Sequence, residues 1–269
     1  MMKRFLAQLY LWILLLVLYA PLVFIAVCSF TESKVLGNWK GFSVQLYSNL
    51  LTGNMQGNSS LLTAVQNTLL IAVAAALVAT LLGTVAAIGI HNLSGRKRGA
   101  ISFLNSIPMI NPDVITGVSL FLLFVFLHVG QGFLTVILAH ITFCTPYVVL
   151  SVLPKLRQLN PNTYEAALDL GATPAQALRK VMIPQLKGGM ISGFMLAFTM
   201  SLDDFAVTFF TRGTVGLETL STYIYADARK GGLTPELRPL MTLIFLLILV
   251  VLLVMNLRQE KQKKNAPVI

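Results

Sequence analysis

Charged residues are scarce in this sequence. They make up 11% of its 269 residues, whereas a soluble globular domain carries about 25%. Hydrophobic residues make up 56% and gather in long runs. Runs of roughly 18 or more apolar residues indicate membrane-spanning helices. The composition therefore excludes an ordinary soluble fold and predicts an all-α integral membrane protein.

Cysteines and catalytic motifs are also rare. The two cysteines, Cys28 and Cys144, lie in apolar runs without CxxC or metal-like spacing, so we interpret both as small buried hydrophobes. The chain lacks a G-x-x-x-x-G-K-[ST] phosphate loop, an HExxH pair and a nucleophile elbow. We therefore expect no catalytic residue, no metal site and no cofactor in this chain. A secondary transporter would lack the same motifs, so their absence alone does not decide the class.

Apolar runs repeat along the chain and predict six membrane helices, at residues 6–28, 68–90, 101–127, 133–153, 190–210 and 240–257. The first run is too long for a signal peptide. Six crossings place both termini on one side. With cytoplasmic termini, most of the 20 Lys and Arg fall in inner segments, as the positive-inside rule requires. The net charge of +10 is then an orientation signal, and nucleic-acid binding is not needed to explain it.

This topology divides the chain into a first membrane helix with a cytoplasmic N-terminus, a periplasmic segment, a core of five further helices and a basic tail. The predicted parts are 1–28 (first helix), 29–67 (periplasmic segment), 68–257 (five-helix core, with a cytoplasmic loop at 154–189 and a periplasmic loop at 211–239) and 258–269 (cytoplasmic basic tail). Loops as long as 154–189 are usually functional.

The cytoplasmic loop reads as two short helices joined at a glycine. Asn160 followed by Pro161 is typical of a helix start, and Asn162 with Glu165 adds a capping-box pattern. The first helix ends at Gly171, a candidate left-handed C-cap. Thr173 with Gln176 starts the second helix, which we expect to end before Pro184. The Ala-rich face of such a pair can lie in a groove of another protein or rest on the membrane surface.

A longer pattern runs through this loop. Glu165-Ala166-Ala167, Gly171, Val181 and Ile183-Pro184 resemble, with matching spacing, the EAA motif of the permease subunits of bacterial ABC importers. The resemblance implies a type I importer permease fold with six helices. It also implies a coupling role toward a partner ATPase for Glu165, Ala166, Ala167, Gly171 and Pro184. ATP and Mg would then be bound by that partner.

Three acidic residues fall within predicted membrane helices: Asp113, Asp203 and Asp204. A carboxylate at membrane depth costs about 2.5–3.5 kcal/mol, so it usually faces a bundle interior or a wet cavity. No partner for these acids is evident in the sequence. Asp113 follows Pro108 and Pro112, which disturb the helix and predict an irregular segment lining a cavity. The alternative for Asp113 is a helix N-cap. We interpret His140 as a packed, hydrogen-bonded histidine.

The acidic residues sharpen the resemblance. Ser201-Leu202-Asp203-Asp204, Asn111-Pro112-Asp113 and the segment 140–144 are similar to the second permease subunit of spermidine/putrescine ABC importers. This implies a polyamine pathway that includes Asp113, Asp203, Asp204 and Phe205, in a multi-pass protein of the bacterial inner membrane.

The resemblance also implies a set of partners: a second homologous permease, two copies of an ATP-binding subunit, a periplasmic substrate-binding protein and membrane lipid. Two other readings stay open at this point. One is an ABC permease for ferric ion or a small organic solute. The other is an ion-coupled secondary transporter that uses the same acids as a relay.

Overall fold

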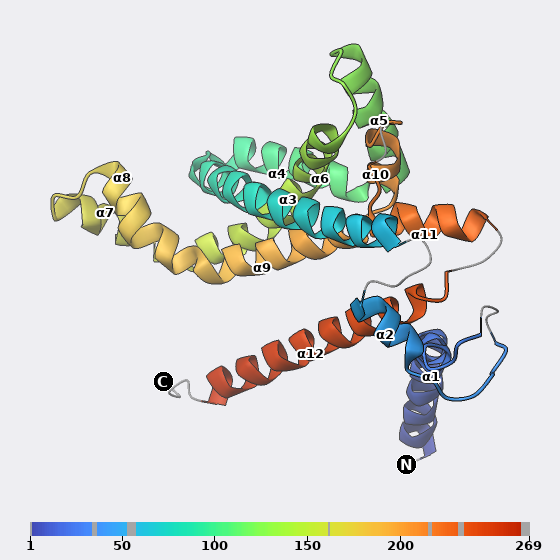
Figure 1. The fold of residues 1–269 in the computed structure, drawn as a ribbon. Coiled ribbons are helices and arrows are strands. Elements are labelled where there is room, and N and C mark those ends of the chain that lie inside the picture. The colour runs from blue at the N-terminus through green and yellow to red at the C-terminus, as the bar shows by residue number, and fades with distance from the viewer. Residues whose placement is uncertain are drawn as a thin grey trace. The chain divides into compact units, whose positions relative to one another are not determined.

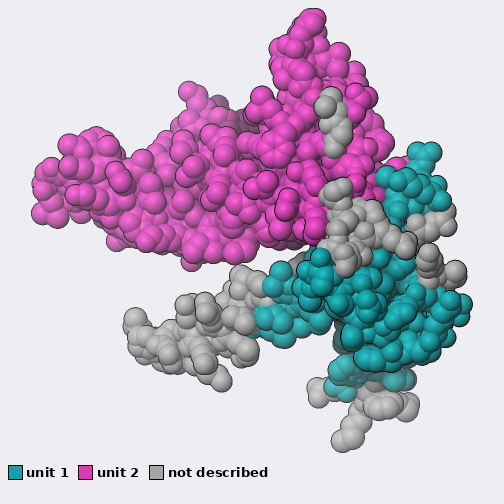
Figure 2. Space-filling model, in the orientation of Figure 1, with its two compact units in different colours: residues 1–58, 226–269 teal, residues 59–225 magenta. Residues whose placement is uncertain are grey.

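The regular structure of this protein is helical. A computed structural model describes residues 2–33, 37–52, 58–160, 162–214, 217–230 and 234–264, and within these ranges the regular elements are all helices (Figure 1). The chain forms two compact units, one of residues 59–225 and one that combines residues 1–58 with 226–269 (Figure 2). The all-α prediction is therefore confirmed for this part of the chain.

Helix α6 (Phe133–Gln158) is the centre of the larger unit and packs closely against α3 (Asn58–Asn92) and α9 (Ile183–Asp203). Val148 of α6 is fully buried between two glycines. A Cβ on Gly83 of α3 would lie 2.7 Å from Val148 Cβ, and a Cβ on Gly193 of α9 would lie 3.0 Å from Val148 Cγ1. Such close backbone approach replaces the hydrophobic driving force that helices lack within lipid.

The contact between α6 and α9 follows a stripe of small residues at every fourth position of α9: Gly189, Gly193, Ala197 and Ser201. These residues meet, in order, Val152, Val148, Cys144 and His140 of α6. The two helices are therefore antiparallel, and residues four apart lie on one helix face. The buried Cys144 donates a weak hydrogen bond to the Ala197 carbonyl at 3.4 Å, so its prediction as a small buried residue is confirmed.

Helix α9 is continuous with the second short helix of the loop at residues 154–189. The short helix α8 (Pro174–Ala177), the π-helical turn η1 (Leu178–Met182) and α9 form one 30-residue helix, 174–203. The expected end before Pro184 is therefore wrong. The Ile183 N–H donates to the Leu178 carbonyl, five residues back. This wider turn directly precedes Pro184, which has no N–H to donate, and the helix passes through it.

Two of the predicted membrane helices are broken. Helices α4 (Gly95–Ile110) and α5 (Asp113–Phe126) are bent by 103° at Asn111 and Pro112. The predicted single span 101–127 is therefore two helices, with the irregularity expected before Asp113. The span predicted to end at 210 also breaks: α9 ends at Asp203, and α10 (Ala206–Thr211) follows. Helix α10 packs closely on α5, where a Cβ on Gly117 would lie 3.1 Å from the Ala206 carbonyl oxygen.

The smaller unit contains α1 (Met2–Cys28), α2 (Gln45–Thr52) and α12 (Leu237–Lys264), with α1 and α2 each contacting α12. Tyr47 of α2 packs on Phe30 and shares a 2.6 Å hydrogen bond with Ser29 at the end of α1. Arg238 of α12 donates to the Ser33 carbonyl at 2.8 Å. The loop between the two units contains α11 (Leu220–Arg229), and α7 (Asn162–Asp169) belongs to the coupling loop.

Four of the described helices are long and apolar enough to cross a membrane, and the bent pair α4–α5 adds a fifth if it forms one span. The four are residues 8–28, 60–92, 133–158 and 174–203; the described apolar part of α12 is the shorter segment Leu237–Leu247. The protein is thus a multi-span membrane protein by helix length and composition. Six crossings and cytoplasmic termini stay predictions.

Replacing Gly83 with alanine tests the packing at Val148. The added Cβ meets Val148 and the Thr145 carbonyl, at 2.7 and 3.1 Å, so we expect a loss of about 1–3 kcal/mol. Gly89→Ala on the same helix is the matched control, because a Cβ there has nothing within 4 Å. Melting of the purified protein in detergent should place Gly83→Ala below, and Gly89→Ala at or above, the native value. Equal melting temperatures would contradict this packing.

Candidate functional site

Asp204 caps the helix that follows the α9 break. Its side chain is 5% exposed. Its Oδ1 accepts a hydrogen bond from the Val207 N–H at 3.2 Å, and its Oδ2 accepts from the N–H and the hydroxyl of Thr208, both at 2.8 Å. A side-chain oxygen that accepts from the first free N–H groups is the usual way to start a helix. Asp204 therefore determines where α10 begins.

His140 of α6 reaches the same carboxylate from the other side. Its side chain is 1% exposed, with Nδ1 2.6 Å from the Ser201 hydroxyl and Nε2 2.9 Å from the Thr208 hydroxyl. Nε2 also lies 3.4 Å from Asp204 Oδ2. The interpretation of His140 as a packed, hydrogen-bonded residue is confirmed. The expectation that Asp204 has no partner within the chain is wrong, because it accepts three hydrogen bonds and lies next to His140 Nε2.

Asp203 and Asp113 stand at the two helix breaks and are exposed. Asp203 is the last residue of α9 and Asp113 is the first of α5. The Asp203 carboxylate is within Coulombic range of both Asp204 and Asp113, and Asp113 is within the same range of the Tyr147 hydroxyl of α6. Residues 90 positions apart are thus brought to one region, which the sequence predicted only as two separate candidates.

Asp113 is not the N-cap of α5. That position belongs to Pro112, whose carbonyl accepts from the N–H groups of Ile115 and Thr116. Asp113 lies in the first turn, where a negative charge is favourable to the helix dipole and the carboxylate stays available to other groups. The capping alternative for Asp113 is therefore contradicted.

Phe205 belongs to an aromatic cluster beside Asp203. Its ring centroid lies 4.9 Å from that of Tyr225 and 5.4 Å from that of Phe209. The Arg212 guanidinium lies 5.5 Å from the Phe209 ring centroid. The cluster holds the short segment between α9 and α10 against α11 and presents aromatic faces, which attract cations.

The loop at residues 154–189 has the predicted local structure at Asn160, at Gly171 and at Thr173 with Gln176. Gly171 has φ +87°, a left-handed conformation that favours glycine. The Ala172 N–H donates to the Ala167 carbonyl at 3.1 Å and closes the end of α7. Thr173 and Gln176 form the predicted capping box, with bonds of 3.3 and 3.1 Å. At the start of α7, the Asn160 side chain accepts from the Asn162 N–H at 3.0 Å, so Asn160 is the capping residue.

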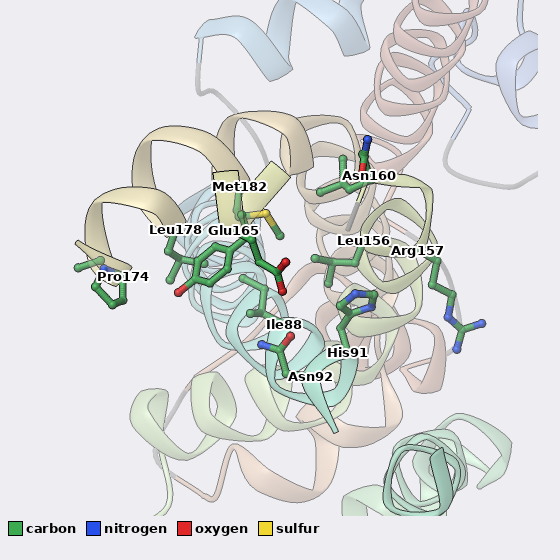
Figure 3. A pocket seen from close by; sticks show the side chains of 13 residues that line it. Ile88, His91, Asn92, Leu156, Arg157, Asn160, Glu165, Pro174, Leu178 and Met182 are labelled. Carbon is green, nitrogen blue, oxygen red and sulfur yellow. The ribbon is translucent and has the colours of Figure 1, made fainter. Parts of the chain in front are cut away.

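A cavity of about 740 Å³ lies beside the coupling loop, between the ends of α3 and α6 and the helices α7 and α8. Glu165 shares its lining with His91, Asn92, Arg157 and Met182, among others (Figure 3). Ala166 is exposed and Leu170 is 90% exposed at the tip of the loop.

Broken helices and a two-helix loop between long apolar helices are features expected of a membrane transport permease. Residues 79–262 match the family described as the binding-protein-dependent transport system inner membrane component. The chain belongs to this family and is therefore an inner membrane protein of a transport system, without a catalytic site of its own.

Two relatives are similar over most of their length. The chain is 40% identical over 235 residues to the putrescine transport system permease protein PotI of Escherichia coli K12, covering 84% of this chain and 81% of the relative. It is 35% identical over 244 residues to the spermidine/putrescine transport system permease protein PotC of Haemophilus influenzae, covering 91% and 92%.

The fold also matches solved structures. A crystal structure of a bacterial ABC transporter that imports the acidic polysaccharide alginate gives a TM-score of 0.70, with 96% of each chain covered at 16% identity. At this identity the likeness concerns the fold alone, which is that of an ABC transporter permease.

Proposed function

We propose that this chain is a permease subunit of an ATP-driven importer of polyamines. It forms the translocation pathway with a second homologous permease and receives cargo from a periplasmic binding protein. Two copies of an ATP-binding subunit, which bind ATP and Mg, drive the cycle. The observation that carries the choice of cargo is the pair of exposed carboxylates, Asp113 and Asp203, which stand one at each of two helix breaks and interact electrostatically. Both relatives are named for transport of putrescine or of spermidine and putrescine.

The chemistry of the cargo fits this pair. A polyamine is a flexible chain of ammonium groups separated by methylenes. Leaving water costs each ammonium its hydration, and a nearby carboxylate offsets that cost. Backbone irregularity at membrane depth is tolerated where it lines a cavity, and this supports a position on the pathway for the two carboxylates. Phe205, next to Asp203, adds an aromatic face for an ammonium or its methylenes.

The loop at residues 154–189 is the part of the chain that we propose to bind the ATP-binding subunit. With six crossings and both termini in the cytoplasm, residues 154–189 face the ATP-binding subunit. Glu165 turns toward the cavity beside the loop, which leaves Ala166, Ala167 and Leu170 as the surface that docks. Because one helix runs from Pro174 through Pro184 to Asp203, a displacement of the loop is carried to the helix break by a single rigid element.

The cargo assignment is tested by Asp203→Asn, which removes a charge with almost no change in shape. We expect uptake of labelled putrescine or spermidine by cells carrying the complete transporter to fall about tenfold, equivalent to about 1.4 kcal/mol. Asp203→Glu, which keeps the charge, should retain most of the uptake. Native-level uptake by the Asp113→Asn/Asp203→Asn double variant would contradict the assignment, as would uptake of ferric ion or a small organic solute in place of polyamine.

The coupling assignment is tested at Gly171. Valine is strained at a positive φ, at a cost of about 1–2 kcal/mol, and should distort the turn that presents Leu170. We expect the ATP-binding subunit retained on purification of the transporter to fall roughly tenfold, with the chain still inserted. Gly99→Val is the control, since a Cβ there meets nothing within 4 Å. Full retention in Gly171→Val would show that the loop is not the docking element.

A further inference from the structure

The hydrogen bonds around Asp204 define its charge state. Its carboxylate is surrounded by the N–H groups of Val207 and Thr208, the Thr208 hydroxyl and His140 Nε2. An ionised carboxylate offers about four lone-pair positions and accepts only. Three of these neighbours donate to it without ambiguity, so the anion is satisfied inside the protein although its side chain is only 5% exposed.

The same bonds assign the proton on His140. The Thr208 hydroxyl has one hydrogen and donates it to Asp204 Oδ2. Its contact with His140 Nε2 at 2.9 Å must therefore use the Thr208 oxygen as acceptor, and Nε2 must carry a hydrogen. In the neutral ring, Nδ1 then accepts from the Ser201 hydroxyl at 2.6 Å. The donors run in one direction, from Ser201 through His140 and Thr208 to Asp204.

We propose that His140, Ser201, Thr208 and Asp204 form a buried clamp that fixes the position of Asp203, and that Asp204 itself does not meet the cargo. Ser201 lies two residues before Asp203, and Asp204 directly follows Asp203. The clamp attaches both flanks of Asp203 to α6 and α10, and the Ser221 hydroxyl of α11 adds a bond of 2.6 Å to the Asp204 carbonyl. His140 is thus a positioning residue.

The cargo part of this inference rests on the proposed function, but the clamp does not. Of two adjacent acids, one is buried with its lone pairs occupied and the other is exposed at a break near Asp113. The alternative is that Asp204 leaves the clamp and contributes its charge to the pathway. The clamp and this alternative predict different labelling at position 203 when a clamp bond is removed.

Cysteine at position 203 provides a readout without any polyamine. In the assembled transporter carrying Asp203→Cys, with Cys28 and Cys144 replaced by alanine, a cationic methanethiosulfonate reagent should react about fivefold faster than an anionic one, because Asp113 acts through water at short range. Adding Asp113→Asn should reduce this preference, and the neighbouring Asp204 accounts for the part that remains. This control shows that the preference reports the neighbouring charge.

Two matched pairs then break the clamp. The glutamine amide reaches the position of His Nε2 and the asparagine amide that of Nδ1. We expect His140→Gln to keep the cationic preference, because it still donates toward Thr208 and Asp204, and His140→Asn to reduce it to less than about twofold. Thr208→Ser keeps the hydroxyl and should behave as native, whereas the isosteric Thr208→Val should behave as His140→Asn. The second pair decides the matter if a His140 variant fails to assemble.

Unchanged labelling in both His140→Asn and Thr208→Val would overturn the clamp. Unchanged labelling in Asp204→Asn together with loss of polyamine uptake would assign Asp204 to the cargo and also overturn the proposal. If labelling follows the clamp while Asp203→Asn leaves uptake intact, the clamp stands and the proposed cargo fails. The two hypotheses therefore fail in different measurements.

Discussion

The close packing of α6 with its two neighbours at Val148 is the constraint on which the larger unit depends. Val148 lies between Gly83 and Gly193, and this spacing leaves no freedom for the α6–α9 register. Each step of four residues along α9 then meets a step of four residues back along α6. The register that pairs Gly193 with Val148 also pairs Ser201 with His140, so a backbone contact in the bundle decides which polar groups meet near the break.

Polar residues in a membrane bundle are costly unless they are paired, and this bundle pairs them at the end of its tightest helix contact. The small-residue stripe brings the α6 and α9 backbones together from Gly189 through Ala197. At Ser201 the stripe ends with a hydroxyl, and the hydrogen-bonded group that follows fills the space where α9 stops. Asp203 is left outside this group and Asp204 inside it, so two neighbouring carboxylates have different environments.

The local features of the chain could be predicted from its sequence, whereas the contacts between distant helices could not. Gly171, Thr173 with Gln176 and the break before Asp113 depend on a few neighbouring residues, and each is present. Val207 and Thr208, which donate to Asp204, are close in sequence, but His140 lies some 64 positions away on another helix, so no local pattern reveals that contact. The sequence signal for the α6–α9 contact is the spacing of Gly189, Gly193, Ala197 and Ser201, which our prediction did not use. The expected helix end before Pro184 is wrong because a π turn accommodates the proline, and no local sequence pattern predicts such a turn.

That π turn has a geometric consequence for the whole 30-residue helix. One additional residue in a turn shifts the angular phase of everything before it by about 100° relative to everything after it. The face of α8 that contacts α7 and the stripe of α9 that contacts α6 therefore point in different directions around the axis of one continuous helix. Gain or loss of a single residue between 178 and 182 would re-orient α7 and α8 relative to the stripe, while the packing of α9 on α6 stays as it is.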